Sequence, residues 1–166
     1  MIHYLAADQN QLVFFFGFLG VVLALAGGSV GSAYGIAKSS LGILAAGRRI
    51  PGGVIKNLIP VVMAGMLGIY GLIIAVFIVS TISQNTYSAY KGFAHLWSGG
   101  VVGLSCVPVG FCTGICGEYS TYVTGNKALS GQHQQQLFVS MVLLQVFAGA
   151  CGLYALIVGL LLAVQS

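Results

Sequence analysis

The sequence contains very few charged residues. Two of its 166 residues are acidic and six are basic, so charged residues make up 5% of the chain, against about 25% in an ordinary soluble domain. A surface with so few charges cannot face water over most of its area. Because 58% of the residues are hydrophobic, the composition indicates a protein that lies in lipid and argues against a soluble enzyme or binding domain.

The basic residues are also too scattered to bind nucleic acid. The net charge is only +4, and it forms no basic stripe or patch of the kind that contacts phosphates. Arg48, Arg49 and Lys56 lie between the first two long apolar runs. The positive-inside rule places this loop, and with it the 118–135 loop, in the cytosol. Four membrane spans then place both termini and the 83–92 loop on the lumenal side.

Four long apolar runs account for most of the chain. A spanning helix needs roughly 20 apolar residues, and on that basis we predict spans at 12–46, 58–82, 93–117 and 136–163. Little sequence remains for a soluble domain, so any catalytic or nucleotide-binding domain would belong to a partner. The N-terminal segment has no basic region or small-residue cleavage site, so we expect the first span to be its own targeting signal.

Glycines recur at four-residue spacing in the first and third runs. Gly27, Gly31 and Gly35 follow this spacing in the first, and Gly110 and Gly114 in the third. Small residues at this interval share one helix face and let helix backbones approach closely in lipid. We expect the five glycines to lie at the packed interfaces of a ring, although glycine is also simply tolerated in membrane helices.

No motif in the sequence indicates a catalytic centre, a cofactor or a metal. The glycines do not have the spacing of a phosphate-binding loop, and no strand precedes them. Cys112 and Cys116 share a helix face but have no facing histidine to complete a metal site. We expect them to act as small packing residues, and we expect His133 to be a solvated loop histidine.

The two halves of the chain resemble one another. The matching segments are IYGLIIAVFIV (69–79) with LYALIVGLLLA (153–163), and GSAYGIAK (31–38) with GFCTGICG (110–117). The sequence therefore predicts an all-α membrane protein whose four transmembrane helices form two duplicated helical hairpins, residues 1–82 and 83–166, in one integral unit. Glycine-rich helices suit a tight inner wall and aliphatic helices an outer wall against lipid, so we expect the unit to assemble into a ring.

Three segments carry a likeness to a known family: GSAYGIAKSSLGI, KNLIPVVMAGMLGIYGLIIAVFI and LFVSMVLLQVFAGACGLYALIVGLLL. They resemble the proteolipid (c-type) subunit of eukaryotic V-type proton-translocating ATPases, over nearly the whole chain. The resemblance implies a non-catalytic subunit of a membrane ring that turns against a stator subunit with a buried arginine. It also implies that a soluble ATPase sector and central stalk drive the rotation, and that the pump acidifies a vacuole or similar endomembrane compartment.

The sequence departs from this family at the residue that carries the proton. The family motif on the fourth helix is Phe-Ala-Glu, two residues, then Gly-Leu-Tyr. Here FAGACGLY (147–154) matches at both ends, but Gly149 stands at the glutamate position. A sister subunit type has its carboxylate on the second helix, where this chain has Gly65. A buried carboxyl stays neutral against lipid and ionises beside an arginine, so we predict that no residue of this chain carries a proton.

Two polar neighbours of Gly149 are poor substitutes for a carboxylate. Gln145 lies one helical turn earlier, but its amide does not titrate. We expect it to form an interhelical hydrogen bond instead. Tyr154 has an ordinary pKa of about 10, too high for a proton carrier near neutral pH.

Three interpretations remain open at this point. In the first, the chain is a structural member of a heteromeric ring in which other proteolipid subunits bear the glutamates. In the second, it is a proton-carrying subunit whose glutamate was replaced, for example by engineering. In the third, it is a stand-alone oligomeric pore or lipid-filled ring with no link to ATP hydrolysis. The match of both hairpins favours ring membership, and we rank the three in this order.

Overall fold

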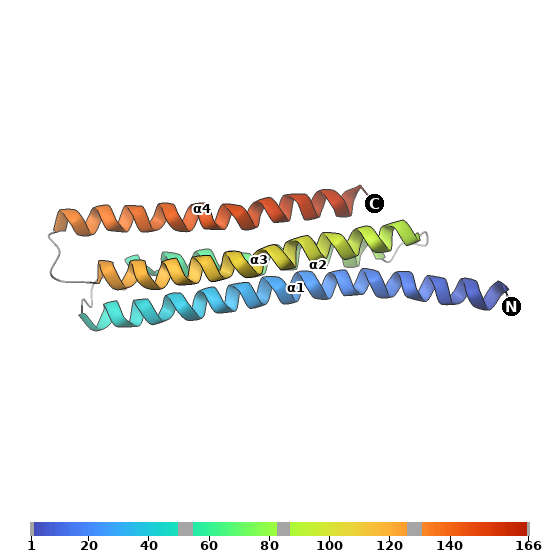
Figure 1. Cartoon of the computed structure of the whole chain (residues 1–166), viewed down its shortest axis with the longest axis horizontal. Coiled ribbons are helices and arrows are strands. Elements are labelled where there is room, and N and C mark those ends of the chain that lie inside the picture. Colours follow the sequence, from blue (N-terminus) through green and yellow to red (C-terminus); the bar gives the residue numbers. More distant parts are fainter. Residues whose placement is uncertain (1, 50–54, 83–86, 126–130, 166) are drawn as a thin grey trace.

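A computed structural model of the chain describes four long helices, which lie side by side (Figure 1). The structure describes residues 2–49, 55–82, 87–125 and 131–165. The chain turns back after each long helix, so both ends of the chain lie at the same end of the bundle (Figure 1). The elements are α1 (Ile2–Arg49), the short 3-10 helix η2 (Lys56–Leu58), α2 (Ile59–Ile82), α3 (Ala89–Thr124) and α4 (Gly131–Val164).

Each of the four α-helices is long and apolar enough to cross a membrane. The most apolar 18-residue window of each has a mean hydropathy between 1.7 and 2.5, and the described residues contain no β-strand. The predicted fold class and the predicted number of spans are therefore confirmed. The chain is an integral membrane protein, with four candidate membrane-spanning helices in the ranges that the structure describes.

The predicted extent of the 118–135 loop was wrong. The helix α3 continues to Thr124 and α4 begins at Gly131, so His133, expected in a loop, lies in the first turn of α4. The helix α3 can include the polar residues at its end because its own carbonyls accept their hydrogen bonds. The Thr121 hydroxyl, for example, donates to the Gly117 carbonyl at 2.7 Å. Gln134, in the first turn of α4, donates to the Thr124 carbonyl at 2.6 Å. This bond satisfies one of the last α3 carbonyls, which have no partner within the helix.

The helix starts follow ordinary capping rules. α3 begins at Ala89, earlier than predicted, because the Ser88 side chain accepts a hydrogen bond from the Lys91 backbone N–H. Pro60 is the second residue of α2, where a missing N–H costs little. Pro108 lies inside α3, which remains one continuous helix. Neighbouring helices and local adjustment make such a proline tolerable in a membrane span.

The helices α1 and α3 pack backbone against backbone. A Cβ added at Gly31 would collide with the Cys106 carbonyl, and one added at Gly110 would collide with the Gly31 backbone. A Cβ added at Gly27 would likewise collide with the backbone of Gly103. Only glycine fits such an approach, so the four-residue spacing marks a real helix interface within this chain.

The other two predicted glycines belong to the same interface. A Cβ at Gly35 would lie 2.8 Å from the Ala64 Cβ of α2 and 3.2 Å from the Gly110 carbonyl oxygen. A Cβ at Gly114 would lie 3.1 Å from the Gly35 Cα. Figure 1 shows α3 between α1 and α4, and α4 rests on α3 and α2. The buried apolar core between the helices consists of Ala24, Leu67, Ile74, Ile78, Val102, Cys106 and Leu156.

Candidate functional site

The position assigned to the family carboxylate lies where α4 faces α2. Gly149 is half-buried on α4, and a Cβ added there would meet the Met63 Cε of α2 at 3.3 Å. Gly65, the corresponding position on α2, has no atom within 4 Å of an added Cβ. The nearest neighbour of a Cβ at Gly149 is therefore the flexible tip of a methionine, and a Cβ at Gly65 has no neighbour within 4 Å.

The atoms that an added Cβ would meet distinguish Gly149 and Gly65 from the glycines between α1 and α3. At Gly31 and Gly110, a Cβ would collide with backbone atoms that cannot move aside. Among the described residues, nothing comparable surrounds Gly149 or Gly65, so packing within the chain does not require glycine at either position. A Cβ at the position where the family has its carboxyl group needs only a small shift of the Met63 side chain.

The surface of α4 around Gly149 is apolar and exposed. Phe147 is 69% exposed and Tyr154 is 63% exposed. Cys151 is also exposed, and its thiol donates to the Phe147 carbonyl of the same helix at 3.6 Å. The Tyr154 side chain is thus directed outward on this surface, away from the core.

Gln145 points in the opposite direction, into the bundle. Its side chain is fully buried, and its Nε2 donates to the Thr113 carbonyl of α3 at 2.9 Å. This is the interhelical hydrogen bond expected from the sequence. Because the amide is held against α3, it is not presented on the exposed surface around Gly149.

The four spans contain one carboxyl group, Glu118, which lies on α3 and not on α2 or α4. Glu118 lies in the last two turns of α3, where its Oε2 is 3.4 Å from the Lys38 Nζ of α1. Both side chains are about one-third exposed, at 32% for Glu118 and 38% for Lys38. The only other acidic residue, Asp8, precedes the first span. Among the residues that the structure describes, no carboxyl group therefore lies at the α2–α4 contact beside Gly149.

The described part of the chain contains no cluster of three or more His, Cys, Asp or Glu side chains that could hold a metal ion. Cys112 is exposed, Cys116 is half-buried and both are free thiols. They lie on one helix, as their spacing indicates.

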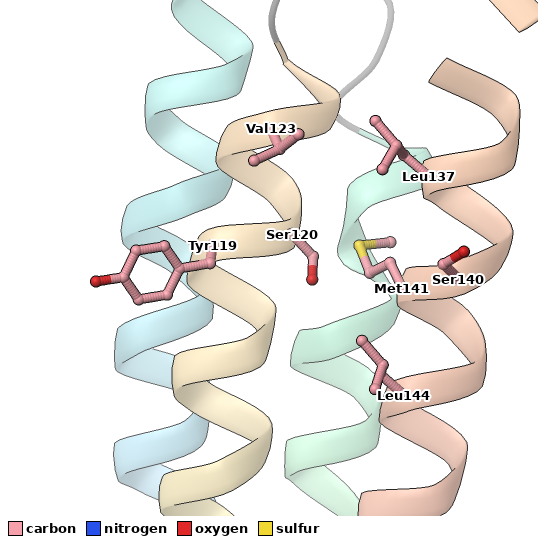
Figure 2. Close-up of a pocket in the computed structure, with 7 residues that line it drawn as sticks. All are labelled: Tyr119, Ser120, Val123, Leu137, Ser140, Met141 and Leu144. Carbon is pink, nitrogen blue, oxygen red and sulfur yellow. The ribbon is translucent and has the colours of Figure 1, made fainter. Parts of the chain in front are cut away.

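A shallow groove runs between α3 and α4 near the end of the bundle where these helices are joined (Figure 2). Its volume is about 220 Å³. Its polar groups are hydroxyls, and in Figure 2 the Tyr119 ring points away from α4. The residues that line the groove include no acid, base or nucleophile pair suited to catalysis. They are Tyr119, Ser120, Val123, Leu137, Ser140, Met141 and Leu144.

Comparison with known proteins identifies the family to which the chain belongs. The family model described as the C subunit of ATP synthase matches residues 19–78 and 96–162, one stretch in each hairpin. The V-type proton ATPase 16 kDa proteolipid subunit of Chrysotila carterae is 46% identical over 154 residues, which cover 89% of each chain. The chain belongs to the V-type ATPase proteolipid family.

Two further proteolipids have nearly the same similarity to this chain. The 16 kDa proteolipid (c-type) subunit of the V-type proton ATPase of Homo sapiens is 41% identical over 151 residues, covering 91% of this chain and 92% of the relative. The c' subunit of the V-type proton ATPase of Saccharomyces cerevisiae is 41% identical over 149 residues, covering 89% and 87%. The family resemblance inferred from the sequence is therefore confirmed.

Sequence reasoning missed several polar contacts that position the helices of this proteolipid. The Ser98 hydroxyl of α3 donates to the Gly159 carbonyl of α4 at 2.6 Å. Tyr87 Oη lies 2.7 Å from the Nδ1 of the fully buried His95. Polar residues within apolar runs indicate that such contacts exist. The sequence does not show which carbonyl or ring each polar side chain contacts.

Proposed function

We propose that this chain is a ring subunit in the membrane rotor of a V-type proton ATPase, and that it takes part in ATP-driven proton transport without carrying a proton itself. Its similarity to named V-type proteolipids over most of its length supports the first part. The tight contact between the glycine-rich helices α1 and α3 supports their place in the inner wall of a ring. We take residues 1–82 and 83–166 as the two duplicated hairpins of this one unit.

The second part of the proposal rests on one observation, which is glycine at position 149. Neither Gly149 nor Gly65 offers a titratable group, and no backbone atom blocks a Cβ at either position. Gln145 is held inside the bundle by Thr113, and Glu118 is paired with Lys38. Each copy of the chain in a ring would therefore remove one proton from the number carried in a full rotation.

The proposal also names the partners that such a subunit needs. These are other proteolipid ring subunits bearing glutamates, a stator membrane subunit with a buried arginine, the soluble ATPase sector with its central stalk, and membrane lipid. An arginine without a counter-charge is costly in a membrane. When Gly149 passes the stator, a carboxylate of a neighbouring subunit or water must therefore stabilise the arginine.

We also propose in which membrane the protein resides and how it is oriented there. A V-type proteolipid belongs in a vacuolar or other acidic endomembrane. Arg48, Arg49 and Lys56 support a cytosolic position for the loop between the first two spans, and with it for the loop between the last two. The two termini then lie on the lumenal side.

Purification from native membranes tests this function. A tagged copy of the chain, extracted in a mild detergent, should bring with it glutamate-bearing proteolipids and soluble ATPase subunits. Mass spectrometry of the isolated complex should also give its copy number per ring. Recovery of a homo-oligomer without any ATPase subunit would contradict the proposal and would favour a stand-alone pore or lipid-filled ring.

A further inference from the structure

Two fully buried polar atoms have no hydrogen-bond partner among the described residues. They are the Ser39 Oγ of α1 and the Gln145 Oε1 of α4. Both side chains have no exposed surface. A buried polar atom without a partner costs about 1–3 kcal/mol, and such atoms are uncommon in native proteins. Two of them on different helices therefore call for an explanation.

Both side chains lie beside Gly117 of α3. A Cβ added at Gly117 would collide with the Ser39 Oγ and would lie 3.2 Å from the Gln145 Nε2. It would also lie 2.8 Å from the Pro60 Cβ of α2. Because Gly117 has no side chain, the Ser39 hydroxyl, the Gln145 amide and the apolar Pro60 ring can all approach the same point on α3.

The chemistry of these two groups matches a single water molecule. One N–H of the Gln145 amide is used in the bond to Thr113, and the atom without a partner is the acceptor Oε1. The serine hydroxyl can donate or accept. We propose that an ordered water binds between Ser39 and Gln145, donating one hydrogen to Gln145 Oε1 and bonding to Ser39 Oγ with its remaining capacity. Buried waters in proteins fill this role for polar groups that would otherwise be unsatisfied.

A metal cation fits the same atoms less well. Oxygen ligands suit sodium or calcium, but both oxygens here are neutral. The adjacent charges are Lys38, next to Ser39, and Glu118, next to Gly117, and these two already pair with each other. Within the described part of the chain, no unpaired negative charge remains beside the site to offset a buried cation.

A water at this point would connect α1 to α4 through the interior. Gln145 is one turn from Gly149, so the water and the Thr113 bond together would fix the rotation of α4 about its own axis at the level of the missing carboxylate. This inference concerns the interior of the bundle and does not depend on whether the chain carries protons.

A density map of the intact membrane assembly that resolves ordered water tests the proposal directly. We expect one isolated peak within hydrogen-bond distance of both Ser39 Oγ and Gln145 Oε1. A map without that peak, in which Ser39 donates to a carbonyl of α1, would overturn the proposal. So would a peak with the short contacts of a metal ion and a dependence on sodium in the buffer.

A double-mutant cycle gives a second test that needs no map. The variants are Ser39→Ala and Gln145→Met, with Ser40→Ala as the matched control because the Ser40 hydroxyl already donates to the Ala37 carbonyl of its own helix. We expect Ser39→Ala to lower the melting temperature of the detergent-solubilised assembly, and to lower it no further when Gln145→Met is present. Equal effects of Ser39→Ala in both backgrounds, as expected for Ser40→Ala, would contradict a shared water.

Discussion

A Cβ on Gly149 would lie 3.3 Å from the Met63 Cε, the end of a flexible side chain on the neighbouring helix. Backbone atoms, by contrast, block a Cβ at Gly110. The two glycines therefore have different physical meanings in one bundle. Gly110 is required by the close approach of α1 and α3, whereas the neighbour of Gly149 on α2 is a flexible side chain that can shift.

Alanine substitution should separate these two kinds of glycine. Gly110→Ala forces a methyl group into the backbone of Gly31, and overpacking of this kind costs about 1–3 kcal/mol or more. Gly149→Ala needs only a small shift of Met63 and gains helix propensity of up to about 1 kcal/mol. Thermal melting of the purified assembly should therefore show a clear loss for Gly110→Ala and little or no loss for Gly149→Ala.

The Gly65→Ala variant is the matched control for that comparison, because an added Cβ there meets no atom within 4 Å. It should behave like Gly149→Ala. If Gly110→Ala melted at the same temperature as these two variants, the close contact between α1 and α3 would be wrong.

Removing the charge of Glu118 should leave proton transport unchanged. Glu118 lies in the last two turns of α3, away from the α2–α4 contact at Gly149, and its carboxylate already pairs with Lys38 at 3.4 Å. The Glu118→Gln variant should acidify vesicles at the wild-type rate when ATP is added, after correction for the amount of assembled complex. Lys38→Gln is the control that removes the other partner of the pair. A collapse of acidification in Glu118→Gln alone would make Glu118 a proton carrier and would refute the role assigned here.

The hydrogen bond between Ser98 and Gly159 should stabilise the contact between α3 and α4. Interhelical hydrogen bonds in membranes contribute about 0.6 kcal/mol on average, and up to about 1.7 kcal/mol. Ser98→Ala removes a 2.6 Å bond between two helices, so it should destabilise the bundle by an amount in this range. Ser140→Ala is the control, because the Ser140 hydroxyl donates within α4 to Gln136. Equal unfolding free energies for the two variants would show that the Ser98 bond adds nothing.

Tyr87 should make the stability of the bundle sensitive to high pH. Burial raises the pKa of the Tyr87 hydroxyl above its usual value of 10.0. The folded chain therefore holds this proton more tightly than the unfolded chain does. The resulting stability is fully present below pH 10 and is lost as the pH rises through the pKa of the folded state. Melting temperatures measured across this range should fall for the wild type.

Tyr87→Phe is the control for this pH dependence. The variant retains a ring that can stack on Phe14, as Tyr87 does at a centroid distance of 5.3 Å, but has no group to ionise. Its melting temperature should fall less steeply above pH 10, and the last step of tyrosinate absorbance should disappear. An unchanged slope would show that Tyr87 titrates as an exposed tyrosine.

The sequence predicts the fold well because lipid imposes a simple rule on the chain. Every backbone group in a membrane must be satisfied within a helix, so long apolar runs predicted the four spans. The same rule does not define where a helix ends in water. Thr121 and Thr124 looked like loop residues, yet their hydroxyls bond to carbonyls of α3 and the helix continues.

The candidate site was predictable in position but not in detail. The internal repeat and the family resemblance locate Gly149 and Gly65 in the sequence. Neither could say that Gln145 turns inward to Thr113 or that the nearest neighbour of Gly149 is Met63. Those facts depend on how α4 is rotated against α2 and α3, and the apolar residues around α4 are too uniform to fix that rotation from sequence.

Labelling with dicyclohexylcarbodiimide, which reacts with protonated buried carboxyl groups, tests the central claim most directly. In an assembly purified from native membranes, mass spectrometry should find the label on glutamate-bearing proteolipids and none on the α4 peptide of this chain. A Gly149→Glu variant should gain a label at that position, which would show that the reagent reaches the site. A label on α4 of the unaltered chain would contradict the account, because this chain would then carry a proton of its own.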